Sequence, residues 1–232
     1  MRKISINAIA SVNALCVILL LLYVAVHLPT FNMSFYRWQY SVNDTFNVVS
    51  MQEDELMAVT QHMLDYMRGR TPNLQIEAIV DGQSRPFFSE REILHMIDVY
   101  DLFMLGNGIR NLAAALILGT IALIWFMREP ILLTLAKAFR WVSASLIASL
   151  AVLTFLIALD FNHAFIIFHE IFFDNDLWLL DPATELLINI VPLQFFITLS
   201  SIIAAIFFAL LASLFAAASF VCRRMRNSSE SL

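Results

Sequence analysis

The run AIASVNALCVILLLLYVAVHL, residues 8–28, contains no Asp, Glu, Lys or Arg. An α-helix of about 20 apolar residues is long enough to cross the ~30 Å hydrocarbon core of a bilayer. Arg2 and Lys3 precede the run, as basic residues do in a secretory signal peptide. However, the run is longer than the apolar core of about 7–15 residues in such peptides, and no small-residue cleavage site follows it. We therefore interpret residues 8–28 as a first membrane helix.

Three further apolar runs of similar length occupy residues 109–127, 141–159 and 193–222. Hydrophobic residues make up 60% of the chain and charged residues 14%, against about 45–50% and about 25% in soluble proteins. The apolar excess is concentrated in the four runs, which is typical of membrane helices. The pattern predicts an all-α membrane protein, with a bundle of four transmembrane helices and a small extracytoplasmic α+β cap.

Basic residues near the ends of the runs predict the orientation in the membrane, because Lys and Arg are enriched in cytoplasmic loops. In a four-helix topology the following fall on one side: Arg2, Lys3, Arg128, Lys137, Arg140, Arg223, Arg224 and Arg226. We expect that side and both termini to be cytoplasmic, and residues 29–108 and 160–192 to be extracytoplasmic. The net charge of −5 argues against nucleic acid as a partner, since nucleic acid binds to basic surfaces.

The first outer segment contains signals for a helix and a hairpin. Ser50 followed by Glu53 fits a capping box at a helix start, and Gly69 is at a typical stopping position. Apolar residues recur at helical spacing between them, which predicts an amphipathic helix of about five turns. Asp81-Gly82 between two short apolar-rich runs predicts a β-hairpin.

A second capping box, Ser89 with Glu92, predicts another helix from Glu90 to Leu105. We expect this helix to end at Gly106, and the sequence GNG to form a flexible break before the second membrane helix. The third membrane helix is expected to continue outward to about Phe172. The segment 182–192, PATELLINIVP, is expected to form a short interfacial helix.

Two of the five histidines lie among carboxylates in these outer segments. His95 follows Arg91 by one helical turn and precedes Asp98 by another, while Asp174 and Asp176 lie close after His169. If both histidines lie at the same membrane surface, the imidazoles can act as base and proton partner near neutral pH. A structural role at a wet boundary is the alternative for each of them.

Other kinds of catalytic centre lack their usual motifs. The sequence has no G-x-S-x-G elbow and no Gly-rich phosphate loop. Both cysteines, Cys16 and Cys222, fall in predicted membrane helices, which leaves no thiol nucleophile on the outer side. A zinc site with His95, His169 and an acid is a rival interpretation, although H-E-x-x-H does not occur. It would make the protein a membrane metallohydrolase.

Two motifs resemble a known family. FFSEREILHMIDVYDLF (87–103) and FHEIFFDNDLWLLDPATELL (168–187), set between four membrane runs in this order, are similar to the bacterial lipoprotein intramolecular transacylases, the Lit family. The resemblance implies an acyltransferase of the bacterial cytoplasmic membrane, with its active site at the outer-leaflet face. Its substrate would be a diacylated lipoprotein within membrane lipid. The sn-2 acyl chain would move from the diacylglyceryl group to the α-amino group of the N-terminal cysteine, without a cofactor or metal.

The same resemblance implies His95 and His169 as the catalytic residues. We expect His95 to be the base, with Asp98 orienting it. Supporting roles are expected for these residues: Arg91, Asp98, Asp176, Trp178 and Asp181. Capping and interfacial anchoring are equally good explanations for Asp176, Trp178 and Asp181. The alternative function is a non-enzymatic membrane scaffold or accessory subunit whose outer domain binds a partner.

These interpretations divide the chain into five segments. Residues 1–28 hold the N-terminus and first membrane helix, and 29–108 the extracytoplasmic cap. Residues 109–159 hold the second and third membrane helices. Residues 160–192 form the extracytoplasmic catalytic loop, and 193–232 the fourth membrane helix and the basic tail.

Overall fold

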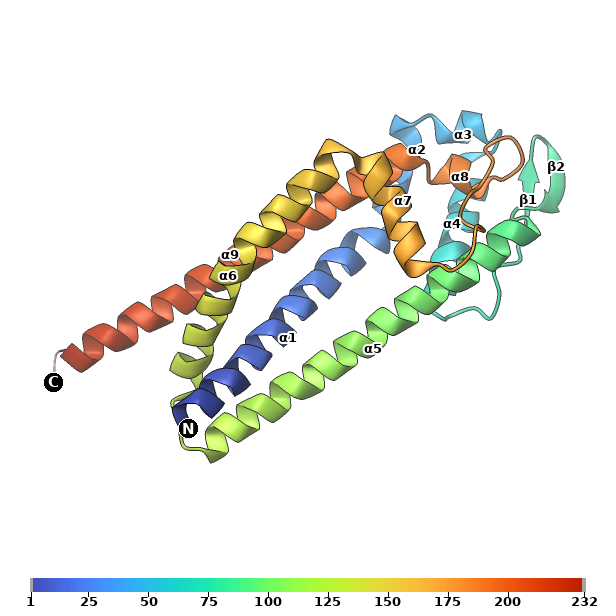
Figure 1. Ribbon diagram of the computed structural model, residues 1–232. Helices are drawn as coiled ribbons and strands as arrows, with labels where there is room; N and C mark the ends of the chain where they lie inside the picture. Colours follow the sequence, from blue (N-terminus) through green and yellow to red (C-terminus); the bar gives the residue numbers. More distant parts are fainter. Residues whose placement is uncertain (1, 231–232) are drawn as a thin grey trace. The chain divides into compact units, whose positions relative to one another are not determined.

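The computed structural model describes residues 2–230, and it is mostly helical with one two-stranded sheet (Figure 1). Its elements are α1 (Arg2–Thr30), α2 (Met33–Val42), α3 (Thr45–Val48), α4 (Glu53–Met67), β1 (Glu77–Val80), β2 (Gln83–Pro86), α5 (Glu90–Phe126), α6 (Ile131–Leu159), α7 (Phe161–Phe172), α8 (Leu187–Ile190) and α9 (Leu193–Glu230). Four helices, α1, α5, α6 and α9, are long and apolar enough to cross a membrane. The prediction of a four-helix, multi-pass membrane protein with a small sheet is confirmed.

The chain divides into two compact units. We call Met1–Val26, Asn107–Leu159 and Ile203–Leu232 the membrane unit, because it contains most of the apolar runs. His27–Gly106 and Asp160–Ile202 form the other unit, which we call the histidine unit, because it contains His95 and His169. Each unit is described separately below.

The membrane unit has a core of alanine, larger aliphatic and aromatic side chains, and an apolar outer surface. Ala14, Ile18, Phe139 and Leu211 are among the residues buried together in this core. Many other large apolar side chains of the unit are exposed. Exposed apolar surface of this extent is expected where lipid tails, and not water, surround the helices.

The predicted break at Gly106 is wrong, because α5 runs without interruption from Glu90 to Phe126. A glycine inside a helix costs only about 1 kcal/mol relative to alanine, so the sequence GNG does not by itself end the helix. Side chains next to it also hold this part of the chain. The Tyr23 hydroxyl donates a hydrogen bond to Asn107 Oδ1 at 2.7 Å, and it accepts one from Arg110 at 2.7 Å. The helix that carries His95 is therefore also a membrane helix.

The predicted outward continuation of the third membrane helix is also wrong in one respect. The chain is helical as far as Phe172, but α6 ends at Leu159 and α7 is a separate helix. Asp160 has a non-helical backbone (φ −144°, ψ 81°), and its carboxylate accepts a hydrogen bond from the His163 backbone N–H at 3.0 Å. An aspartate in this N-cap position satisfies a donor that the first turn of a helix leaves free. Asp160 therefore starts a new helix.

The helix predicted after Ser50 exists, but without the predicted capping box. The N-cap of α4 is Gln52, whose side chain makes no capping bond. Ser50 has a left-handed backbone (φ 52°), and its carbonyl accepts the Asp81 N–H at 3.1 Å. Glu53 instead forms an ion pair with Arg37 at 2.8 Å. The tertiary contacts of Ser50 and Glu53 replace the local capping motif.

The hairpin and the second capping box agree with the predictions. β1 and β2 pair antiparallel with Val80 opposite Gln83, and Asp81 and Gly82 form the turn with φ of 53° and 73°. Two positive φ angles are the requirement of a type I′ turn, which explains the Asp-Gly sequence. The segment 182–192 is less helical than expected, since its only helix is α8, Leu187–Ile190.

Candidate functional site

The two histidines singled out in the sequence lie side by side in the histidine unit. His95 is on α5 and His169 is on α7, and each side chain is buried with 7% of its surface exposed. The centroids of the two imidazole rings are 6.1 Å apart. Two nitrogen bases at this separation can both reach groups of one substrate molecule.

The hydrogen bond of His169 determines which of its nitrogens can act as a base. His169 Nδ1 is 2.7 Å from the backbone oxygen of Phe165, one turn earlier on α7. A carbonyl oxygen can only accept, so Nδ1 carries the hydrogen and Nε2 keeps its lone pair. Burial lowers the pKa of His169, and the Phe165 bond, which raises it, offsets only part of this effect. His169 is therefore a neutral imidazole at neutral pH, with Nε2 free to accept a proton.

Aromatic rings enclose both histidines. Phe173 makes an edge contact with His95 at 5.3 Å and also contacts His169 at 5.4 Å. Trp178 lies against the His169 imidazole with centroids 4.8 Å apart and an interplanar angle of 32°. Within the described part of the chain, the buried His95 Nδ1 has no hydrogen-bond partner. The pair therefore has aromatic surroundings, in which His95 Nδ1 is available for a further contact.

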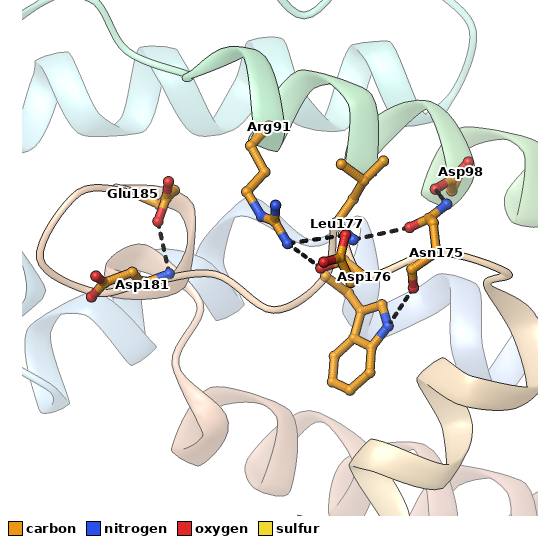
Figure 2. A network of polar contacts seen from close by, with 8 residues as sticks. Arg91, Asp98, Asn175, Asp176, Leu177, Asp181 and Glu185 are labelled. Atoms are coloured by element: carbon orange, nitrogen blue, oxygen red, sulfur yellow. Dashed lines mark hydrogen bonds and ion pairs between the residues drawn. The ribbon is translucent and has the colours of Figure 1, made fainter.

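The segment between α7 and α8, residues 173–186, crosses α5 close to the histidines, and we call it the strap. Polar contacts attach the strap to α5 (Figure 2). Arg91 donates to the backbone oxygen of Asp176, and lies 3.4 Å from the Asp176 carboxylate. Asn175 Nδ2 donates to Asp98 Oδ2 at 2.9 Å. The strap is thereby attached to α5 on the turns before and after His95.

A buried carboxylate attaches the start of α8, next to the strap, to α5. Glu92 has no exposed surface, and it accepts the backbone N–H of Ser89 at 2.6 Å, as the capping box predicts. It also accepts the backbone N–H of Leu187, the first residue of α8. One side chain thus caps α5 and fixes the end of the strap.

Most of the predicted site residues come together here. His95, His169, Arg91, Asp98, Asp176 and Trp178 all belong to this cluster. Asp181 does not contact the histidines in the contacts described. Its backbone N–H donates to Glu185 at 2.7 Å (Figure 2). Its carboxylate accepts from the Ala183 backbone N–H at 2.9 Å, so Asp181 shapes a turn of the strap.

Two residues of the site were not anticipated from the sequence. Asn175 was interpreted only as part of a turn, and Glu92 only as a helix cap. The partner of Asn175 is Asp98, 77 positions earlier, and that of Glu92 is Leu187, 95 positions later. A sequence signal existed only for Glu92, in the Ser89 capping motif, and it indicated a local contact.

A groove borders the histidine pair. Asp98 and Asp101 contribute acidic groups to it, and the remaining lining is apolar: Leu102, Leu105, Phe172 and Phe173. Phe173 is shared between this groove and both histidines. Among the described residues, no three His, Cys, Asp or Glu side chains gather as a metal ion would require.

Four membrane-crossing helices and a buried histidine pair define an integral membrane protein with a site suited to acid–base chemistry. The chain belongs to the lipoprotein intramolecular transacylase (Lit) family, whose model matches residues 11–196. It is therefore an acyltransferase of the membrane that processes lipoproteins, as the resemblance of its two motifs indicated.

Solved structures with the same fold are those of the membrane integral lipoprotein intramolecular transacylase Lit from Bacillus cereus. One is similar with a TM-score of 0.73 and 15% identity, and covers 97% of this chain and 99% of that chain. A variant with one histidine replaced by arginine gives a TM-score of 0.72 and 16% identity, with 98% and 96% covered. The corresponding alanine variant gives 0.72 and 16%, with 97% of each chain covered. A comparison with the sequences of curated proteins finds no match.

Proposed function

We propose that this protein moves the sn-2 acyl chain of a diacylglyceryl lipoprotein to the α-amino group of its N-terminal cysteine, with His169 as the general base and His95 as its proton partner. The observation that carries this proposal is the His169 tautomer, with Nδ1 tied to Phe165 and Nε2 free beside the second imidazole. The proposal differs from our expectation from the sequence, which made His95 the base. It also gives Asp98 another role, since its carboxylate accepts from Asn175.

The proposed reaction needs only proton transfers from the protein. The amine nitrogen attacks the carbonyl carbon of the sn-2 ester, and His169 Nε2 takes the proton that the nitrogen loses. The new C–N bond forms an amide, and the ester C–O bond breaks. The departing sn-2 oxygen takes a proton from the imidazole pair, which returns the site to its starting state. The products are an N-acylated cysteine and a glyceryl hydroxyl within one lyso-form lipoprotein.

The substrate carries both reacting groups, so the proposed reaction requires few protein groups besides the histidine pair. Amine and ester belong to one molecule, so no second substrate has to be bound. Well-oriented intramolecular reactions gain roughly 7–11 kcal/mol from proximity. In the groove beside the pair, Asp98 already accepts from Asn175, which leaves the Asp101 carboxylate for the cysteine ammonium before it is deprotonated. The apolar side chains of the groove are suited to an acyl chain.

The topology is part of the proposal. The lipoprotein's acyl groups lie in a membrane leaflet, so the histidine pair must work at a membrane surface. The distribution of Lys and Arg makes that surface the extracytoplasmic one, with both termini in the cytoplasm. The five segments predicted from the sequence follow from this orientation, with the catalytic loop at 160–192.

The test is mass spectrometry of the N-terminal peptide of a reporter lipoprotein, in cells that make the diacylated form. The wild-type protein should give a lyso-form, N-acylated peptide. His169→Asn and His95→Asn should each reduce the yield of this product by roughly 10²- to 10⁴-fold, the usual range for a general acid or base. His163→Asn is the matched control, because His163 is on the same helix α7 but is exposed.

The proposal is wrong if His169→Asn retains full activity while folded and inserted in the membrane. An unchanged diacylglyceryl cysteine with the wild-type protein would instead favour a scaffold that binds a partner through the histidine unit.

A further inference from the structure

We propose that Asn175 is a positioning residue, which holds Trp178 against the His169 imidazole and so fixes the ring of the proposed base. The inference rests on the proposed function of His169. It adds a residue that the sequence motifs do not single out, and a specific task for the strap.

Asn175 uses its side chain and its backbone for three different contacts. Its Nδ2 donates to Asp98 Oδ2 at 2.9 Å on α5. Its Oδ1 accepts the Leu177 backbone N–H at 3.0 Å, which closes a tight turn of the strap. Its backbone oxygen accepts Trp178 Nε1 at 3.0 Å. Asn175 therefore links α5, which carries His95, to the indole that contacts His169. Its hydrogen bond to Asp98 is drawn in Figure 2.

The Phe165 hydrogen bond still allows the His169 imidazole to tilt, and the contact with Trp178 restricts this tilting. The bond from Nδ1 fixes the direction of one edge of the imidazole, but the ring can still tilt about it. Trp178 lies at 4.8 Å with a small interplanar angle, and Phe165 contacts the same ring at 4.2 Å. These two rings oppose tilting, so the lone pair of Nε2 keeps its direction.

Arg91 makes the other contact between α5 and the strap, to both the backbone oxygen and the carboxylate of Asp176. The Asp176 carboxylate is 77% exposed, and exposed ion pairs contribute little to stability. The Asn175 contact with Asp98 is exposed as well, but it acts on the residue whose backbone oxygen binds Trp178 Nε1 directly. We therefore place the positioning role on Asn175 and not on Asp176.

A swap of the two partners tests this role. Asn175→Asp keeps the Oδ1 acceptor for Leu177 but places two carboxylates in contact, which repel each other. Asp98→Asn removes the charge that attracts the Asn175 amide. The double variant Asp98→Asn/Asn175→Asp restores one donor, one acceptor and the original net charge, with the direction of the bond reversed. The control is Asn162→Asp, the same change at an exposed position in the first turn of α7.

The first readout is the steady-state rate of lyso-form production. We expect Asn175→Asp to lower kcat by roughly 10- to 100-fold, because small misplacements of reacting groups cost about that much. KM should stay nearly unchanged, and the double variant should recover most of the rate. A normal kcat in Asn175→Asp, or no recovery in the double variant, would overturn the proposal. A rise in KM alone would also overturn it, since it would make Asn175 a substrate-binding residue.

The second readout does not require activity. Trp178 can be made the only tryptophan by replacing Trp38, Trp125 and Trp141 with phenylalanine. A protonated imidazole in contact with an indole quenches its fluorescence, so Trp178 emission should change as His169 titrates, and His169→Asn should abolish the change. Asn175→Asp should weaken this response and the double variant should restore it. An unaltered response in Asn175→Asp would refute the positioning role. If the wild-type protein makes no lyso-form product, the proposed function fails, and the fluorescence alone decides whether Asn175 holds Trp178.

Discussion

Replacing Glu92 with alanine should destabilise the histidine unit far more than removing the serine of the same capping box. Glu92 is completely buried and accepts two backbone N–H groups, those of Ser89 and Leu187. A hydrogen bond to a charged group contributes about 1.5–3 kcal/mol. Water can replace the acceptor of the partly buried Ser89 N–H, but not that of the buried Leu187 N–H. We expect Glu92→Ala to lower the free energy of unfolding by about 3–4 kcal/mol.

Ser89→Ala is the matched comparison. It removes a single 3.3 Å contact between Ser89 Oγ and the Glu92 N–H, and a lost N-cap costs ~1 kcal/mol. For a chain of this size, 1 kcal/mol corresponds to about 2–4 °C in Tm. Thermal unfolding in detergent, followed by near-ultraviolet circular dichroism, should show a decrease of roughly 6–16 °C for Glu92→Ala and roughly 2–4 °C for Ser89→Ala. Equal Tm values for the two variants would refute the idea that Glu92 fixes the strap to α5.

Two further predictions concern pH and topology. Burial lowers the pKa of His169, so the imidazole stays neutral at pH values below the ordinary histidine pKa. The acidic limb of the profile of kcat against pH should therefore have its midpoint below pH ~6.5. A midpoint above that pH would contradict the assignment of His169 as base. In a variant with Cys16 and Cys222 replaced by alanine, a membrane-impermeant maleimide added to intact cells should label Gln83→Cys, at the exposed first residue of β2, but not Arg224→Cys in the tail. Labelling of Arg224→Cys alone would invert the proposed orientation.

The sequence predicts well those features that depend on neighbouring residues. The Asp81-Gly82 turn is correct because its two positive φ angles are a local requirement. The Ser89 capping box is correct because both of its partners lie within one turn. Ser50 matches the same motif and fails, because its backbone N–H donates to Asn47 and its would-be partner Glu53 pairs with the distant Arg37.

The site is predictable only in part for the same reason. A histidine close to carboxylates can be recognised from the sequence alone, and both His95 and His169 were found in this way. The role of Asn175 depends on Asp98 in another helix, and the tautomer of His169 depends on the geometry of one backbone oxygen. Periodicity places a residue on a helix face, but it does not say which segment will cover that face.

The two corrected helix boundaries place the two histidines on helices of different length. Because α5 continues through Gly106, His95 is on a helix of 37 residues. Because Asp160 starts a new helix, His169 is on a helix of only 12 residues and lies near its C-terminal end, where the backbone carbonyls have no partner within the helix. For the proposed reaction we therefore expect the contacts of the His169 ring with the Phe165 oxygen and Trp178, and the Asn175 bond to Trp178, to govern the rate.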